Sequence, residues 1–156
     1  MKKYGVLAAL VMAFALTGCG GEKQTEVAAQ EAMADTMINS GRETSDGGFE
    51  RTYPLDNTQG EALHFYVTNE REPSDVYTEL VVTISCGKKE VAREVILPGE
   101  STVVTTMLTE KEKEYTCKAE PGKNGGDMAL CYAIVQGEAE TEEPAAFLDE
   151  IVGEPE

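Results

Sequence analysis

The sequence has no tryptophan, only one histidine and few basic residues. With His64 alone, a metal site built from several histidines is excluded, and a Ser-His or Cys-His catalytic pair would depend on that one residue. Thirteen Lys and Arg stand against 29 Asp and Glu, which gives a formal net charge of −16. A field of that sign repels nucleic acid, so we exclude DNA and RNA as partners.

Long apolar runs are also missing. The apolar run at residues 6–16 has 11 residues, which is too short for the roughly 20 that a membrane-spanning helix needs. Lys2 and Lys3 precede this run. A positive start followed by a short apolar segment is typical of a secretory signal peptide. The sequence therefore predicts export, and removal of residues 1–18 would leave a still more acidic chain.

The end of this segment carries a specific motif. Leu16, Thr17, Gly18 and Cys19 resemble at all four positions the lipobox of bacterial lipoproteins, which has an aliphatic residue, a small residue, Gly or Ala, and then Cys. The resemblance implies that the Cys19 thiol receives a diacylglycerol and that cleavage occurs just before it. Several acyl chains on one residue anchor a protein durably, so we expect Cys19 to hold the chain on the extracytoplasmic face of a membrane.

Residues 19–48 are predicted to be a flexible stalk. Glu, Gln, Ala, Thr and Ser dominate this segment, and the turn-forming cluster at residues 45–48 ends it. Residues 25–38 have good helix propensity, with Ala29, Met33 and Met37 spaced by four. We interpret them as a partly helical spacer, with a short amphipathic helix that contacts the domain or a partner as the alternative.

Residues 49–137 are predicted to be the folded domain. Turn signals recur about every ten residues, between segments rich in Val, Ile, Thr, Tyr and Phe. Apolar and polar residues alternate in the second and third segments, a pattern of antiparallel sheets with one buried face. Seven strands are predicted, at residues 49–54, 62–68, 78–86, 91–97, 102–108, 114–119 and 128–136. Short turns and the lack of a helix among them indicate an all-β, two-sheet, antiparallel immunoglobulin-like sandwich.

One tripeptide supports this architecture. Tyr115, Thr116 and Cys117 resemble strand F of immunoglobulin domains, where a corner tyrosine precedes a cysteine by two residues. The second strand has no cysteine and the chain has no tryptophan. The resemblance therefore concerns the architecture and does not extend to the antibody-type core disulfide.

Residues 138–156 are predicted to be an acidic tail. Phe147, Leu148, Ile151 and Val152 would share one side of a short helix that Gly153 would end. We favour disorder because helices this short are marginal on their own. The alternative is a peptide that docks on the domain or on another protein.

Lipidation of Cys19 leaves Cys86, Cys117 and Cys131 as candidates for a disulfide. Residues 122–127 are predicted to close the last hairpin, and if Asn124 is its centre, Cys117 and Cys131 lie opposite each other. Cys86 is also a plausible partner, since the third and sixth strands are neighbours in this architecture. We predict a structural disulfide that involves Cys117, with its partner left open. No Cys-x-x-Cys motif is present, which argues against redox or zinc chemistry.

We predict no catalytic residues, no metal and no cofactor. His64 is expected to be an exposed strand residue. A copper site of His64, Met107 and Met128 is conceivable because thioethers suit Cu(I), but the spacing of these residues gives it no support. The sequence has no calcium loop with Asp-x-Asp-x-Asp-Gly spacing and no phosphate-binding loop after a strand.

The functional prediction is a membrane-anchored binding or interaction module of unknown ligand, not an enzyme. The segments 69–77 and 120–127 are its candidate binding loops, because loops on a rigid scaffold commonly carry binding residues. The main alternative is an accessory lipoprotein that stabilises an envelope complex through its terminal segments. A metal-binding protein and an enzyme are further alternatives.

Overall fold

The computed structural model describes residues 36–72, 78–138 and 141–154. The predicted signal peptide, the anchor Cys19 and most of the predicted stalk lie outside these residues. The described elements are β1 (Thr36–Ser45), β2 (Phe49–Leu55), η1 (Asn57–Gln59), β3 (Ala62–Asn69), β4 (Leu80–Cys86), β5 (Lys89–Ile96), β6 (Ser101–Met107), β7 (Lys113–Pro121), β8 (Met128–Gly137) and α2 (Pro144–Val152).

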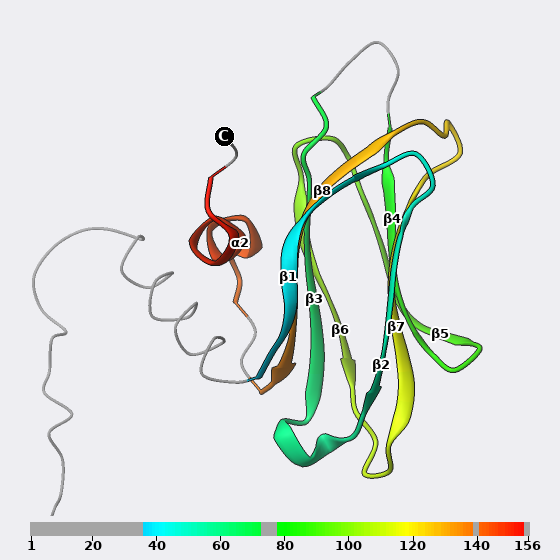
Figure 1. Cartoon of the computed structure of the whole chain (residues 1–156), viewed down its shortest axis with the longest axis vertical. Coiled ribbons are helices and arrows are strands. Elements are labelled where there is room, and N and C mark those ends of the chain that lie inside the picture. Colours follow the sequence, from blue (N-terminus) through cyan, green and yellow to red (C-terminus); the bar gives the residue numbers. More distant parts are fainter. Residues whose placement is uncertain (1–35, 73–77, 139–140, 155–156) are drawn as a thin grey trace, which may run out of the picture.

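The strands form two antiparallel sheets packed face to face (Figure 1). Sheet A has the order β1-β8-β3-β6, and sheet B has the order β2-β7-β4-β5. This arrangement confirms the predicted fold class, a two-sheet antiparallel sandwich. All seven predicted strands are present with boundaries within two residues of those expected, and β1 is an eighth strand that the sequence analysis missed.

The core lies between the sheets and follows the alternation seen in the sequence. Leu63, Phe65 and Val67 of β3 point inward, as do Leu80 and Val82 of β4, and all five are fully buried. Buried apolar area of this kind is the main stabilising contribution in a sandwich, at about 25 cal/mol for each Å² removed from water. The alternation therefore identified the inward face of both strands correctly.

Strand β1 corrects the predicted stalk, which does not extend to residue 48. Among the described strands, β1 pairs only with β8 and lies at the edge of sheet A. A bulge between Met37 and Asn39 changes which residues point inward. After it, the inward positions hold Asn39, Gly41 and Glu43, which pair with inward-facing residues of β8. Because polar residues and glycine stand where apolar ones would signal a strand, the segment has no recognisable alternation.

These polar residues close one side of the sandwich between β1 and β2. The Asn39 amide donates to the Tyr53 hydroxyl at 3.0 Å, and Asn39 Oδ1 accepts from the Tyr132 hydroxyl at 3.4 Å. Farther along, Arg51 lies 3.6 Å from Glu43. The side chains thus satisfy one another, which explains why an edge strand with few apolar residues can still belong to the domain.

Helix α2 corrects the predicted disordered tail over residues 144–152. It lies on sheet A, on the face turned away from sheet B (Figure 1). Phe147 and Leu148 are 0% and 1% exposed, and the Phe147 ring centroid lies 4.3 Å from that of Tyr66. A helix of nine residues is marginal alone, so its contacts with the sheet stabilise it. Of the two readings of the tail, docking on the domain is the one observed.

Tyr115 has the contact that its resemblance to strand F implies. The side chain is 1% exposed, and its hydroxyl accepts a hydrogen bond from the backbone N–H of Thr109 at 3.3 Å. Thr109 lies six residues upstream, in the connection that leads into β7. The tyrosine thus fixes the chain where it enters this strand.

Successive strands run in opposite directions along the sandwich, so the connections gather at its two ends (Figure 1). Four connections meet at one end, which we call the loop end; its described residues are 46–48, 70–72 with 78–79, 97–100 and 122–127. The connection at 122–127 joins β7 of sheet B to β8 of sheet A. The prediction that it closes a hairpin is therefore wrong, because the chain crosses between the two sheets there.

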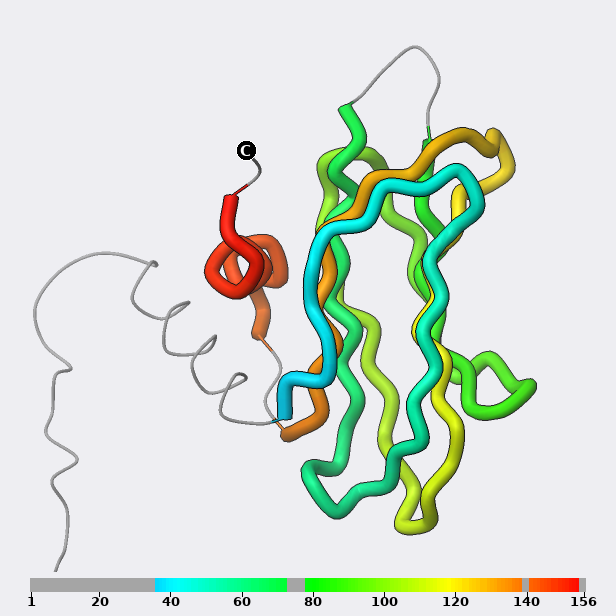
Figure 2. Tube along the Cα trace, viewed as in Figure 1, coloured from blue at the N-terminus to red at the C-terminus, as the bar shows by residue number. Residues whose placement is uncertain are grey.

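The opposite end is where the described chain enters the domain, and we call it the entry end. Thr36 begins β1 there, opposite Gln136 near the end of β8. Figure 2 shows these first and last strands running side by side. Gly60 also lies at this end and packs directly against the backbone of Gly137. The chain therefore joins the sandwich at the end away from the four loops.

Candidate functional site

The two candidate binding loops, at 69–77 and 120–127, meet at the loop end, with residues 73–77 outside the described part of the chain. The backbone N–H of Gly122 donates to the Glu79 carbonyl at 2.8 Å, so the second loop is in direct contact with the end of the β3–β4 connection. A Cβ added to Gly122 would lie 2.2 Å from Glu79 Cγ. The glycine therefore lets the Glu79 side chain lie flat against the loop.

Asn69, the last residue of β3, organises this end. Its side chain is fully buried and donates to the backbone carbonyls of Thr78 at 3.1 Å and of Ile96 at 3.4 Å. Its Oδ1 accepts from the backbone N–H of Arg71 at 3.2 Å. One amide thus ties together the two sides of the β3–β4 connection and the end of β5. Because buried polar groups are costly without partners, these bonds favour one loop arrangement.

The turn between β5 and β6 is also held closely. The backbone N–H of Asn69 donates to the Glu100 carbonyl at 2.9 Å, and Gly99 donates to the Asn69 carbonyl at 2.8 Å. Glu100 Oε2 in turn accepts from the backbone N–H of Leu97 at 2.9 Å. The turn at Pro98–Gly99 joins β5 of sheet B to β6 of sheet A, so these bonds link the two sheets.

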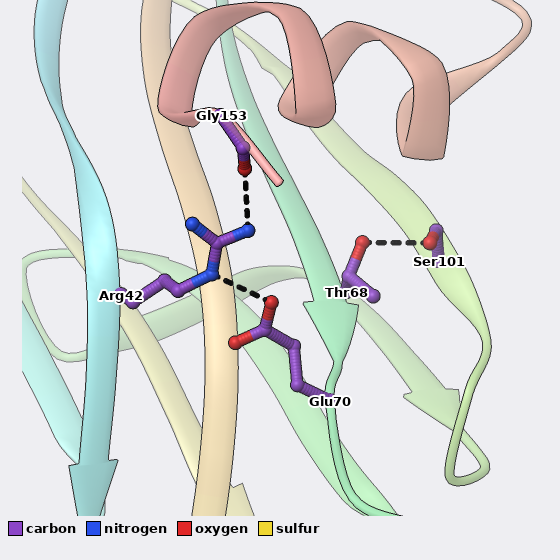
Figure 3. A network of polar contacts seen from close by, with 5 residues as sticks. All are labelled: Arg42, Thr68, Glu70, Ser101 and Gly153. Atoms are coloured by element: carbon purple, nitrogen blue, oxygen red, sulfur yellow. Dashed lines mark hydrogen bonds and ion pairs between the residues drawn. The ribbon is translucent and has the colours of Figure 1, made fainter. Parts of the chain in front are cut away.

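A polar network connects the loop end to helix α2 (Figure 3). Arg42 Nε donates to Glu70 Oε1 at 2.8 Å, and Arg42 Nη2 donates to the Gly153 carbonyl at 2.6 Å. The hydrogen bond with Glu70 raises the pKa of Arg42 above its usual value, so the guanidinium remains charged. Thr68 and Ser101 lie nearby, with their hydroxyl oxygens 2.7 Å apart.

The described part of the loop end is acidic. Its charged residues are six acids and two bases: Asp46, Glu70, Glu72, Glu79, Glu100, Asp127, Arg71 and Lys123. Their summed field disfavours an anionic ligand at this end. A neutral or cationic surface is the chemistry that this end accepts most readily.

The cysteines differ from the prediction. Cys86, Cys117 and Cys131 are all free thiols. Cys117 points into the core and Cys131 toward α2, so the predicted opposition of these two is wrong, because it assumed a hairpin at 122–127. Cys86 pairs with Tyr115 and is only diagonal to Cys117. Diagonal residues lie about 7–8 Å apart, beyond the usual Cα separation of a disulfide.

The two more buried thiols are chemically quiet. Burial raises the pKa of the Cys117 thiol to about 12 and that of Cys131 to about 11. Since only the thiolate is an effective nucleophile or metal ligand, both groups stay protonated and unreactive near neutral pH. They act as small core side chains.

His64 is not the exposed residue that was predicted. It is 2% exposed, and its Nδ1 lies 3.0 Å from the Thr105 hydroxyl. It occupies the outer face of sheet A, whereas Met128 is buried between the sheets and Met107 is 62% exposed. The three residues of the copper alternative therefore do not converge. Within the described ranges, no three Asp, Glu, His or Cys residues gather closely enough to hold a metal.

Sequence reasoning missed Arg42 and the organising role of Asn69. Arg42 belongs to the strand that was not recognised. Asn69 was included as the start of a loop, and nothing in a single sequence distinguishes a buried asparagine from a turn asparagine.

Of the helices in the described residues, none is long and apolar enough to cross a membrane.

Comparison with known proteins gives distant likenesses. No family model and no curated protein matches the chain. The CBM22-1–GH10 modules of endo-1,4-β-D-xylanase 10B from Clostridium thermocellum, complexed with xylohexaose, align with a TM-score of 0.36 and 10% identity over 69% of this chain and 30% of that chain. The family 11 carbohydrate-binding module from Clostridium thermocellum, complexed with a β-1,3-1,4-mixed-linked tetrasaccharide, aligns with a TM-score of 0.28 and 8% identity over 69% of this chain and 94% of that chain. This chain spans less than a third of the xylanase chain, and at these scores the sugars in those complexes do not bear on its ligand.

Proposed function

We propose that this chain is a lipoprotein, anchored through Cys19 on the extracytoplasmic face of a membrane, whose β-sandwich uses the loop end to bind a partner. One observation carries the binding proposal: β1 begins at the entry end, opposite the four connections of the loop end. A tether that joins the domain there leaves the loops free to face outward. Loops held on a rigid scaffold are a common location of binding sites.

The hydrogen bonds around Asn69 support the same proposal. They hold the described parts of the loop end in a defined arrangement before any partner arrives. Preorganised loops lose less conformational entropy on binding than flexible ones. The acidic charge of this end favours a partner with a neutral or basic surface over an anionic one.

The accessory role is less well supported. It required the terminal segments to act as free docking peptides, but Phe147 and Leu148 are buried against sheet A. Their apolar surface is thus occupied within the chain. We also propose no catalytic activity, since the buried and half-buried polar side chains that organise this end are already bonded: Asn69 and Glu100 to the backbone and Glu70 to Arg42.

Anchoring is tested by replacing Cys19 with serine, which removes the sulfur atom that would carry the lipid. We expect the wild-type chain in the membrane fraction, with a diacylglyceryl-modified cysteine as its first residue by mass spectrometry. The Cys19→Ser chain should leave the membrane fraction. Cys86→Ser is the matched control and should fractionate like the wild type. A wild-type chain that keeps residues 1–18 and an unmodified Cys19 would show the anchoring proposal to be wrong.

Binding is tested by placing a photo-crosslinking amino acid at Lys123 or at Lys88 in the anchored chain. Both residues are exposed, but Lys123 lies at the loop end and Lys88 in the β4–β5 turn at the entry end. Irradiation of intact cells should give a discrete adduct, seen as a gel shift and a mass increase, at position 123 and not at 88. Equal labelling at both positions, or labelling at 88 alone, would contradict a binding surface at the loop end.

A further inference from the structure

The Arg42 side chain contacts both the C-terminal end of helix α2 and the loop end. Helix α2 packs on sheet A through Phe147 and Leu148. Just before the helix, the backbone N–H of Thr141 donates to the Tyr66 hydroxyl at 3.3 Å. Since nine residues are too few for a stable isolated helix, docking and helix formation are a single event. A segment that left the sheet would therefore also lose its helical structure.

Arg42 holds the far end of this helix. Gly153 ends α2 with φ of 87°, and its backbone N–H donates to the Asp149 carbonyl at 2.9 Å. The Gly153 carbonyl points to Arg42 Nη2 at 2.6 Å. A cation at this position also interacts favourably with the negative end of the helix dipole. Arg42 is thus part of what keeps α2 docked.

The same guanidinium contacts the loop end. Arg42 Nε donates to Glu70, and Glu70 directly follows Asn69 at the root of the β3–β4 connection. The backbone N–H of Glu70 is itself fixed by the Ala129 carbonyl at 2.9 Å. A guanidinium is planar and presents its N–H groups in fixed directions. The orientation that suits Gly153 is therefore linked to the orientation that suits Glu70 (Figure 3).

We propose that α2 is a latch for the loop end: docking of the helix orients Arg42, and Arg42 fixes Glu70 and the root of the β3–β4 connection. Undocking of α2 loosens residues 70–72 at this root, and a change at Glu70 loosens α2. Coupling of this kind is reciprocal by thermodynamic necessity. The coupling between α2 and Glu70 is a property of the free chain. A role for this coupling in regulating ligand binding rests on the proposed function.

The test is hydrogen–deuterium exchange of the full chain without any ligand, so that failure of the latch and failure of the proposed function are distinguishable. Glu70→Gln keeps the shape of the side chain and removes the charge that Arg42 contacts. Although Glu70 does not touch α2 directly, we expect the α2 amides to exchange about fivefold faster or more in this variant. Glu72→Gln is the matched control, because Glu72 is exposed and makes no hydrogen bond or ion pair with another described residue. It should leave α2 unchanged.

The reciprocal measurement uses Phe147→Ala, which weakens docking from the other side. Its α2 amides should exchange faster, and so should the amides of residues 70–72, while the centre of β8 stays protected. Protection of β8 shows that the sandwich remains folded. If α2 exchanges alike in Glu70→Gln and Glu72→Gln, or if residues 70–72 do not respond when Phe147→Ala frees the helix, the latch does not exist.

Discussion

Replacing Asn69 with alanine is expected to lower the free energy of unfolding by about 3 kcal/mol. The substitution removes a buried amide and leaves the carbonyls of Thr78 and Ile96 without their donor. A buried polar group deprived of its partner costs about 1–3 kcal/mol, and two are affected here. The cavity left by the side chain adds to this loss. Urea unfolding followed by circular dichroism measures the change.

Asn57 provides the matched control for this prediction. It is half-buried in η1, and its side chain makes no hydrogen bond within the described part of the chain. Asn57→Ala should therefore change the free energy of unfolding by no more than about 0.5 kcal/mol. If the two variants differ by less than 1 kcal/mol, a value about equal to one ordinary net hydrogen bond, Asn69 does not organise the loop end.

The second large effect is expected at the entry end, for Gly60→Ala. Gly60 has φ of 134°, and a Cβ there would lie 2.4 Å from Gly137 Cα. Residues that have a side chain rarely adopt this backbone conformation. The added Cβ would also clash with backbone atoms of Gly137, which cannot move aside as a flexible side chain could. We expect a loss of about 3–5 kcal/mol, at the upper end of single substitutions. The unfolding midpoint in urea or on heating would report it.

Gly87→Ala separates the two causes of that loss. Gly87 also has a positive φ, at 58°, but a Cβ there meets nothing within 4 Å. This variant should lose only the roughly 1–2 kcal/mol that a left-handed residue costs. A Gly60→Ala chain as stable as the Gly87→Ala chain would mean that β2, β3 and β8 are not packed as closely at the entry end as the structure indicates.

The predictable part of this fold is the part governed by alternation. In β3 and β4, apolar residues at every second position face a core that excludes water, so the sequence reports the strand directly. In β1 the inward positions are Asn39, Gly41 and Glu43. The two polar side chains are satisfied by other strands, Asn39 by Tyr53 and Tyr132 and Glu43 by Arg51. No local pattern marks such a strand, because it is stabilised by its pairing with β8.

The apolar side of helix α2 was recognised in the sequence, but disorder was favoured over docking of the helix on the domain. The missing information was in β8, where residues of both faces are apolar and nearly every position is buried. A continuous apolar strand needs cover on both sides. Cys131, Ala133 and Val135 form the surface on which Phe147 and Leu148 pack. Reading β8 and the tail together would have indicated the contact, whereas each alone does not.

The candidate site was predictable in its location and not in its mechanism. Turn residues identified two segments that do meet at the loop end. The contacts that hold them depend on Arg42 and Asn69. These residues bond partners that lie 27 and up to 111 positions away from them in the chain. Bonds between such distant residues follow from the topology of the sheets, which a single sequence does not reveal.

The order of sheet A constrains how the molecule is made. β8 lies between β1 and β3, so the first described strand has no neighbour until the last strand has arrived. Long-range closure of this kind gives high contact order and slow folding. A growing polypeptide therefore cannot complete sheet A early, because β8, an interior strand of that sheet, is the last of the described strands to be made.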